Sequence, residues 1–191
     1  MLSNWYNLNG PIGSGKTTIF KDIIAHALAK DIPIFGFYQP LLKEKGVRKG
    51  YDIVVFGNGK EERFPFVRPR ERVREDGMLW KFDQNALSNT KNFFDSMKLP
   101  SKRSIIIFDE FGRLESKGKG QWSNYQFLLT KLTSNGIKSS SIISSRNQTL
   151  DNLRSSMKSI GFGKETSQIN LPASKNHIDT FIKTILEDPM I

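Results

Sequence analysis

The stretch "GPIGSGKTT" occupies residues 10–18 and fits the pattern G-x-x-x-x-G-K-[ST]. It follows a short strand candidate at 4–9 and opens a stretch, ending near residue 30, in which apolar residues recur at helical spacing. Glycines let such a loop wrap its backbone N–H groups around an anion, and the following helix directs the positive end of its dipole at it. The sequence therefore predicts a phosphate-binding loop.

The residue types of this loop predict separate roles for its side chains around a bound nucleotide. Lys16 would neutralise the β- and γ-phosphate oxygens, and the Thr17 hydroxyl would be a ligand of Mg²⁺. The expected nucleotide-binding residues are Gly10, Pro11, Ile12, Gly13, Ser14, Gly15, Lys16, Thr17 and Thr18. Asn7 and Asn9 make the preceding strand unusually polar.

A second motif, "SIIIFDEFGRLE" at 104–115, ends an apolar run in two adjacent acids followed by Gly112. The spacing Asp-x-x-Gly is typical of GTP-binding switch proteins, but the later segments "SSRNQTLD" and "TSQINLPAS" lack the N/T-K-x-D pattern that reads guanine. The alternative is a buried strand whose carboxyl end opens onto the ligand crevice. Asp109 would then bind Mg²⁺ through its water shell, Glu110 would be the general base that activates water, and Gly112 would serve a turn.

Strand and helix candidates alternate along the chain. Strands are expected at 4–9, 32–38, 104–110, 139–145 and 166–171, and residues 50–67 read as a hairpin that turns at Gly57-Asn58-Gly59. Helices are expected after Asp83 and near 121–134, 148–158 and 174–187. The charged stretch 68–77 is expected to be an exposed loop, a flap over the nucleotide. The pattern predicts one α/β domain over 1–191, with a parallel sheet covered by helices on both faces.

Composition narrows the class of protein. With 37% hydrophobic and 25% charged residues the chain is expected to be globular, and no apolar run is long enough to cross a bilayer. The first ten residues lack the features of a signal peptide, and there are no cysteines, so a cytoplasmic protein is expected. The net charge of +10 suits either a polyanion partner such as nucleic acid or a lysine-rich solvated surface. A monomer is favoured.

The chain resembles the small cancer-related nucleoside-triphosphatase family in three segments: the phosphate loop, "GFYQPLLKEKGVRKGYDIV" (36–54) and "FDEFGRLE" (108–115), with a weaker match at "SIISSR" (141–146). The family pattern G-F-Y-T-P-E-x-R-x-x-G-x-R-x-G-F is kept at Gly36, Phe37, Tyr38, Pro40, Gly46, Arg48, Gly50 and, as an aromatic, Tyr51. It is not kept at Gln39, Leu41 and Lys43.

The resemblance implies a three-layer P-loop NTPase fold of the RecA-like (ASCE) type, with a mostly parallel sheet and the hairpin as an embellishment. It implies that another strand separates the phosphate-loop strand from the Asp109 strand. It also implies slow hydrolysis of several nucleoside triphosphates, ATP and GTP among them, with loose base specificity. Arg146 is the first candidate for a catalytic arginine, because it follows the strand 139–145. Arg48 and Arg113 are the others.

Two alternatives stay open. The chain could be a kinase that transfers the γ-phosphate to a small nucleoside or nucleotide acceptor, with the arginines of 68–74 as a lid that excludes water. It could also be a basic, nucleotide-gated binder of nucleic acid.

Overall fold

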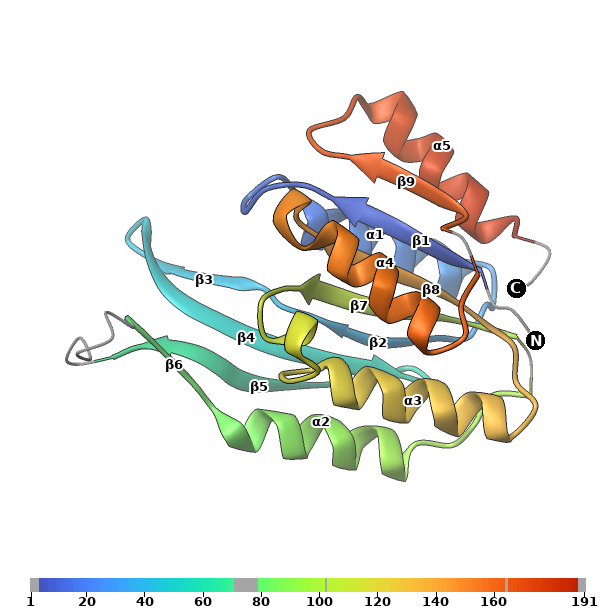
Figure 1. Ribbon diagram of the computed structural model, residues 1–191, viewed down its shortest axis with the longest axis horizontal. Coiled ribbons are helices and arrows are strands. Elements are labelled where there is room, and N and C mark those ends of the chain that lie inside the picture. Colours follow the sequence, from blue (N-terminus) through green and yellow to red (C-terminus); the bar gives the residue numbers. More distant parts are fainter. Residues whose placement is uncertain (1–3, 71–78, 102, 164, 189–191) are drawn as a thin grey trace.

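A computed structural model describes residues 4–70, 79–101, 103–163 and 165–188, and within them the strands form one nine-stranded sheet (Figure 1). The strands are β1 (Trp5–Asn9), β2 (Ile34–Tyr38), β3 (Leu41–Glu44), β4 (Val47–Gly57), β5 (Lys60–Pro69), β6 (Trp80–Phe82), β7 (Ser104–Phe111), β8 (Ser139–Ser145) and β9 (Ser167–Asn170). The α-helices are α1 (Lys16–Ala29), α2 (Gln84–Ser96), α3 (Trp122–Ser134), α4 (Leu150–Ser159) and α5 (Lys175–Leu186). Two short 3₁₀ helices span Glu115–Lys117 and Asn147–Thr149.

The sheet order is β6-β5-β4-β2-β7-β8-β1-β9, and β3 pairs with β4. The five strands from β2 to β9 in this order are parallel, as the alternation of strands and helices predicts. Strand β8 lies between β1 and β7, which confirms the strand order that the family resemblance implies. The α/β fold with a mostly parallel sheet is therefore confirmed.

The hairpin is larger than predicted and is part of the main sheet. Strand β4 pairs antiparallel with β2, so the hairpin of β4 and β5 continues the sheet beyond its parallel half. Strands β3 and β6 were not predicted, because each is short and is formed by pairing with a neighbour. The prediction of a loop at 68–77 is wrong for Arg68 and Pro69, which belong to β5 and pair with β6. Residues 71–78 lie outside the described part.

Two layers of helices cover the sheet. Helices α2, α3 and α4 pack on one face over a core that includes Phe94, Phe108 and Tyr125. Helices α1 and α5 pack on the other face, over a core that includes Phe20 and Ile107 (Figure 1). In β7 successive apolar side chains alternate between these two cores, which explains its unbroken apolar run. Among the described residues, no helix is long and apolar enough to cross a membrane.

Two glycines of the family pattern are explained by close backbone contacts. Gly36, in β2, has a φ of +134°, and a Cβ there would lie 2.0 Å from the carbonyl oxygen of Ile107 in β7. Gly50, in β4, has a φ of +125°, and a Cβ would lie 1.9 Å from the carbonyl oxygen of Val67 in β5. Backbone atoms cannot move aside as a flexible side chain can, so these strands pair in their observed geometry only if the residue is glycine.

We expect Gly36→Ala to lower the free energy of unfolding by about 3 kcal/mol or more, since it adds a backbone clash to an unfavourable φ. The matched control is Gly46→Ala in the β3–β4 turn, where φ is +79° and a Cβ would meet no atom within 4 Å. This control should cost only about 1 kcal/mol. Denaturant unfolding measures both losses, and equal losses would contradict the clash.

Candidate functional site

The phosphate loop joins the carboxyl end of β1 to α1, as the motif predicts. Gly13 and Gly15 have positive φ values of 80° and 93°, which glycine adopts without strain. The Lys16 ammonium lies inside the loop and donates to the carbonyl oxygens of Gly10 and Pro11 at 2.7 and 2.9 Å. Burial lowers the pKa of Lys16, while the nearby carboxylates of Glu110 and Asp109 act in the opposite direction. Thr18, in the first turn of α1, is exposed.

The Asp109 carboxylate is a buried acceptor at the carboxyl end of β7, 3% exposed. Its Oδ2 accepts from the Thr17 hydroxyl at 3.1 Å and from the Gln39 backbone N–H at 2.9 Å. Its Oδ1 accepts from the Ser144 hydroxyl of β8 at 2.7 Å. Burial raises the pKa of Asp109, and the hydrogen bonds oppose that rise. The structure thus brings together the two predicted metal ligands, Thr17 and Asp109.

A β-bulge explains why two adjacent acids can serve one site. Along the β7–β8 pair, Phe108 lies opposite Ile143 and Phe111 lies opposite Ser145, so β7 carries one residue more than β8. Glu110, in the bulge, has a φ of +70° and donates its backbone N–H to the Ser144 hydroxyl at 2.7 Å. In a regular strand Asp109 and Glu110 would point to opposite faces, whereas a bulge re-aims one of them.

The Glu110 carboxylate forms an ion pair with the guanidinium of Arg146, the first residue after β8. Arg146 therefore lies beside Glu110, at the carboxyl ends of β7 and β8. The following 3₁₀ helix is held against the bulged strand, because the Thr149 hydroxyl donates to the carbonyl oxygen of Phe111 at 2.9 Å. The predicted catalytic residues Glu110 and Arg146 are thus direct neighbours, and the Glu110 charge also acts on Lys16.

Gly112 has a local role in the turn after β7. Its N–H donates at 3.1 Å to Oε2 of Glu115, and the other oxygen of Glu115 accepts from the Gln121 N–H at 3.2 Å. The carboxyl of Glu115 is 6% exposed, and burial raises its pKa. The Gly112 N–H is therefore already hydrogen-bonded within the turn. This favours the interpretation of Asp109 as a metal ligand and Glu110 as a general base over the GTP-switch interpretation.

The other two arginine candidates, Arg48 and Arg113, lie on β4 and in the turn after β7. The Arg48 guanidinium, on β4, lies between the rings of Tyr51 and Trp80 at 4.5 Å from each ring centroid. Burial raises the pKa of Tyr51, and the neighbouring Arg48 charge opposes that rise. Arg113 is exposed in the turn after β7.

Sequence reasoning missed Gln39 and Ser144, which hold Asp109 in place. Gln39 stands where the family pattern has Thr, and its side chain donates to the Asp109 carbonyl oxygen at 3.0 Å. The departure from the family pattern at this position was the signal that could have identified Gln39. Ser144 had none, because a serine in a strand of many serines does not stand out. The other two departures, Leu41 and Lys43, lie on β3, opposite Tyr51 and Arg48.

The polar residues of β1 belong to an amide network on the α4 side of the sheet. The Asn9 amide donates to the side-chain oxygens of Asn147 and Asn170 at 2.5 and 2.9 Å. The Ser145 hydroxyl donates to the Asn7 side-chain oxygen at 2.9 Å. The network fastens the end of β1, just before the phosphate loop, to β8 and β9.

A family model described as NTPase matches residues 6–160. The chain is 30% identical to the cancer-related nucleoside-triphosphatase homolog of Mus musculus over 60% of its length and 63% of that protein. It is 29% identical to the nucleoside-triphosphatase THEP1 of Sulfurisphaera tokodaii over 56% of its length and 60% of that protein. The matches thus span less than two thirds of these relatives.

The solution structure of a human cancer-related nucleoside triphosphatase superposes with a TM-score of 0.63 at 17% identity, covering 96% of both chains, and this likeness concerns the fold alone. The family model covers most of the chain, including the phosphate loop, the bulged Asp109–Glu110 segment and Arg146. The chain therefore belongs to the NTPase family.

Proposed function

We propose that residues 1–191 form a single P-loop domain that hydrolyses the β–γ bond of nucleoside triphosphates with Mg²⁺. The observation that carries the proposal is the bulge that sets the Glu110 carboxylate beside Asp109, at the edge of the sheet where Lys16 fills the phosphate loop. The relatives' names describe nucleoside triphosphatases and support the same activity for this chain.

The donor set fits Mg²⁺. The Thr17 hydroxyl and Asp109 carboxylate are oxygen donors 3.1 Å apart, and Mg²⁺ in phosphate-transfer sites takes one or two protein oxygens, with water and phosphate for the rest. Among the described residues there is no cluster of three or more His, Cys, Asp or Glu, so a metal held by protein side chains alone is not suggested. When bound, Mg²⁺ would neutralise the phosphate charge that builds up during transfer.

The protein's own residues would act in sequence around the triphosphate. The loop N–H groups and Lys16 bind and orient the β- and γ-phosphates. The γ-phosphate attracts the Arg146 guanidinium away from Glu110, because phosphate offers it a second, more highly charged partner. The released Glu110 carboxylate then accepts the proton of the attacking water, and Arg146 balances charge on the phosphate oxygens.

Loose base specificity, slow turnover, a cytoplasmic location and a monomeric state belong to the same proposal. A kinase lid finds no support in the described part of 68–74. Arg68 is ion-paired with Asp52, and Arg70 donates to the Trp80 carbonyl oxygen at 3.2 Å. The nucleic-acid alternative rests on the net charge of +10 and on the arginines interleaved with aromatic residues in 63–74, of which 71–74 lie outside the described part.

Phosphate release from ATP, GTP, CTP and UTP tests the activity. We expect all four nucleotides to release phosphate with Mg²⁺. The rates should be below a few per second and within about tenfold of one another, since no base-reading motif is present. Chelation of Mg²⁺ should abolish it. Release that requires a nucleoside or nucleotide acceptor would instead identify a kinase.

Lys16→Ala should weaken nucleoside-triphosphate binding by about a hundredfold or more, because it removes the buried charged donor of the loop. The control is Lys30→Ala, an exposed lysine at the other end of α1. Binding is measured by calorimetry with Mg²⁺ present, and an unchanged affinity in Lys16→Ala would refute the phosphate-loop assignment.

Arg146→Ala should lower kcat by about 10²- to 10³-fold with little change in KM, since the guanidinium acts on charge that develops in the transition state. Arg113→Ala, in the exposed turn, is the matched control and should leave kcat within about twofold. Full activity in Arg146→Ala would show that Arg146 only holds Glu110.

A further inference from the structure

The backbone of the β7 bulge is held by side chains of neighbouring elements. The Glu110 N–H donates to the Ser144 hydroxyl of β8 at 2.7 Å. The next residue is held through its carbonyl oxygen, because the Phe111 oxygen accepts from the Thr149 hydroxyl at 2.9 Å. Thr149 is the residue before α4, so the bulge is attached on this side to the start of that helix.

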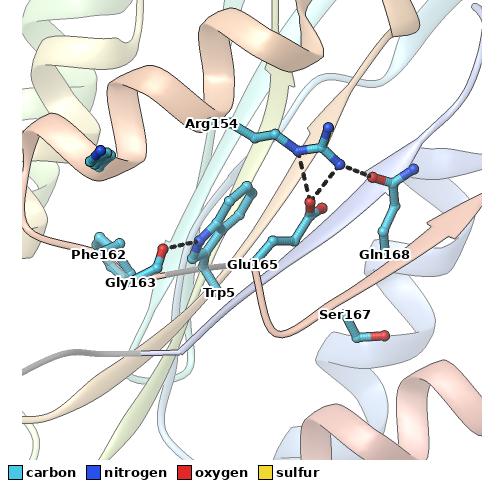
Figure 2. A pocket seen from close by; sticks show the side chains of 8 residues that line it. Trp5, Arg154, Phe162, Gly163, Glu165, Ser167 and Gln168 are labelled. Atoms are coloured by element: carbon cyan, nitrogen blue, oxygen red, sulfur yellow. Dashed lines mark hydrogen bonds and ion pairs between the residues drawn. The ribbon is translucent and has the colours of Figure 1, made fainter.

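Helix α4 is itself fixed to the sheet. Leu153 and Met157 are fully buried in the core on this face. The Nε and Nη2 of Arg154 donate to Oε2 of Glu165 at 3.0 and 2.9 Å, and Nη2 also donates to Gln168 of β9 at 3.0 Å (Figure 2). The Thr149 contact therefore joins the bulge to a helix that is anchored along its length.

On the side of α3 the bulge is held by the carboxylate of Glu115. Its Oε2 accepts from the Gly112 N–H at 3.1 Å, directly after the bulge, and its Oε1 accepts from the N–H of Gln121, the residue before α3, at 3.2 Å. The side chain is buried, and the chain passes close to it. Gly120 has a φ of +60°, and a Cβ there would lie 2.2 Å from Oε1 of Glu115. The carboxylate is thus enclosed by the backbone that it holds.

The start of α3 is a firm attachment for this carboxylate. The side chain of Gln121 is fully buried, and its Oε1 accepts from the Asn124 amide at 2.7 Å. Its Nε2 donates to the Thr90 hydroxyl of α2 at 3.5 Å, and the Asn124 amide also donates to the carbonyl oxygen of Leu87 in α2 at 3.0 Å. Glu115 therefore connects the end of the bulge to the packed pair of α2 and α3.

The chemistry of this contact requires a carboxylate. An ionised carboxylate offers an acceptor oxygen to both N–H groups and brings no donor of its own. An amide of the same size has one acceptor oxygen, so its NH₂ group would face the second N–H. A buried N–H left without an acceptor costs free energy, and the turn would shift to relieve it.

We propose that Glu115 is a positioning residue that aims the Glu110 carboxylate at the attacking water, by fixing the backbone two residues after Glu110. The proposal rests on the proposed function, in which Glu110 is the general base. Glu115 touches neither nucleotide nor water, and acts through the bulge. Rates of transfer depend steeply on geometry, so a small displacement of Glu110 lowers the rate of cleavage without weakening the phosphate loop.

A double-mutant cycle on single-turnover ATP cleavage, with saturating enzyme and Mg²⁺, tests this role. Glu115→Gln should cleave ATP at least about tenfold more slowly than the wild type and bind ATP as tightly within about threefold. In the Glu110→Gln background the same substitution should change the rate by less than about threefold, because no carboxylate is left to aim. Ser116→Ala, the matched control, removes an exposed hydrogen bond from the same turn and should leave the rate within about twofold.

A measurement without catalysis checks the contact itself. The Gly112 N–H should exchange with solvent at least about tenfold faster in Glu115→Gln than in the wild type, as followed by NMR. If Glu115→Gln does not fold, Glu115→Asp replaces it. This side chain keeps the charge but is one methylene shorter, so it cannot reach both N–H groups. It should slow cleavage by at least about fivefold, again only where Glu110 is present.

The two proposals fail in different ways. The role of Glu115 is overturned by unchanged exchange of the Gly112 N–H, by a wild-type cleavage rate in Glu115→Gln, by a loss confined to ATP binding, or by equal slowing in the Glu110→Gln background. A wild-type rate in Glu110→Gln alone would contradict the proposed hydrolysis, and the role of Glu115 with it.

Discussion

The site depends on the buried Asp109 carboxylate and the hydrogen bonds that it accepts. A charged group this deep is stable only when donors surround it, and here they come from three different elements: Thr17 of α1, the Gln39 backbone after β2, and Ser144 of β8. These bonds draw the carboxyl ends of the central strands and the start of α1 together at one point. Lys16 precedes Thr17 in the sequence and Glu110 follows Asp109, so the hydrogen bonds around Asp109 also position these two residues.

The bulge adds the second carboxylate to this arrangement. Ser144 serves both acids, since its hydroxyl donates to Asp109 and accepts the Glu110 backbone N–H. Glu110 adopts a left-handed conformation that costs a non-glycine residue about 1–2 kcal/mol. Such strain persists where the surrounding contacts fix it, and it is concentrated at functional sites. The ion pair with Arg146 holds the Glu110 side chain, which is 23% exposed, at the carboxyl ends of β7 and β8.

The main features of the fold and the site could be predicted because they depend on local patterns. The phosphate loop follows from the spacing of Gly10, Gly15 and Lys16, and the acid pair from the apolar run before it. The strand between β1 and β7 required the family resemblance, since periodicity does not give strand order. Strands β3 and β6 and the role of Ser144 depend on contacts between distant segments, so no local pattern indicated them.

The central claim is that Glu110 activates water, and single-turnover hydrolysis by Glu110→Gln tests it most directly. The amide keeps the size of the carboxylate but is a far weaker proton acceptor. With the enzyme in excess over labelled ATP and Mg²⁺, the account predicts that the variant binds ATP as tightly as the wild type within about threefold. It also predicts that the variant cleaves ATP at least about a hundredfold more slowly. Cleavage at a rate near that of the wild type would contradict the account.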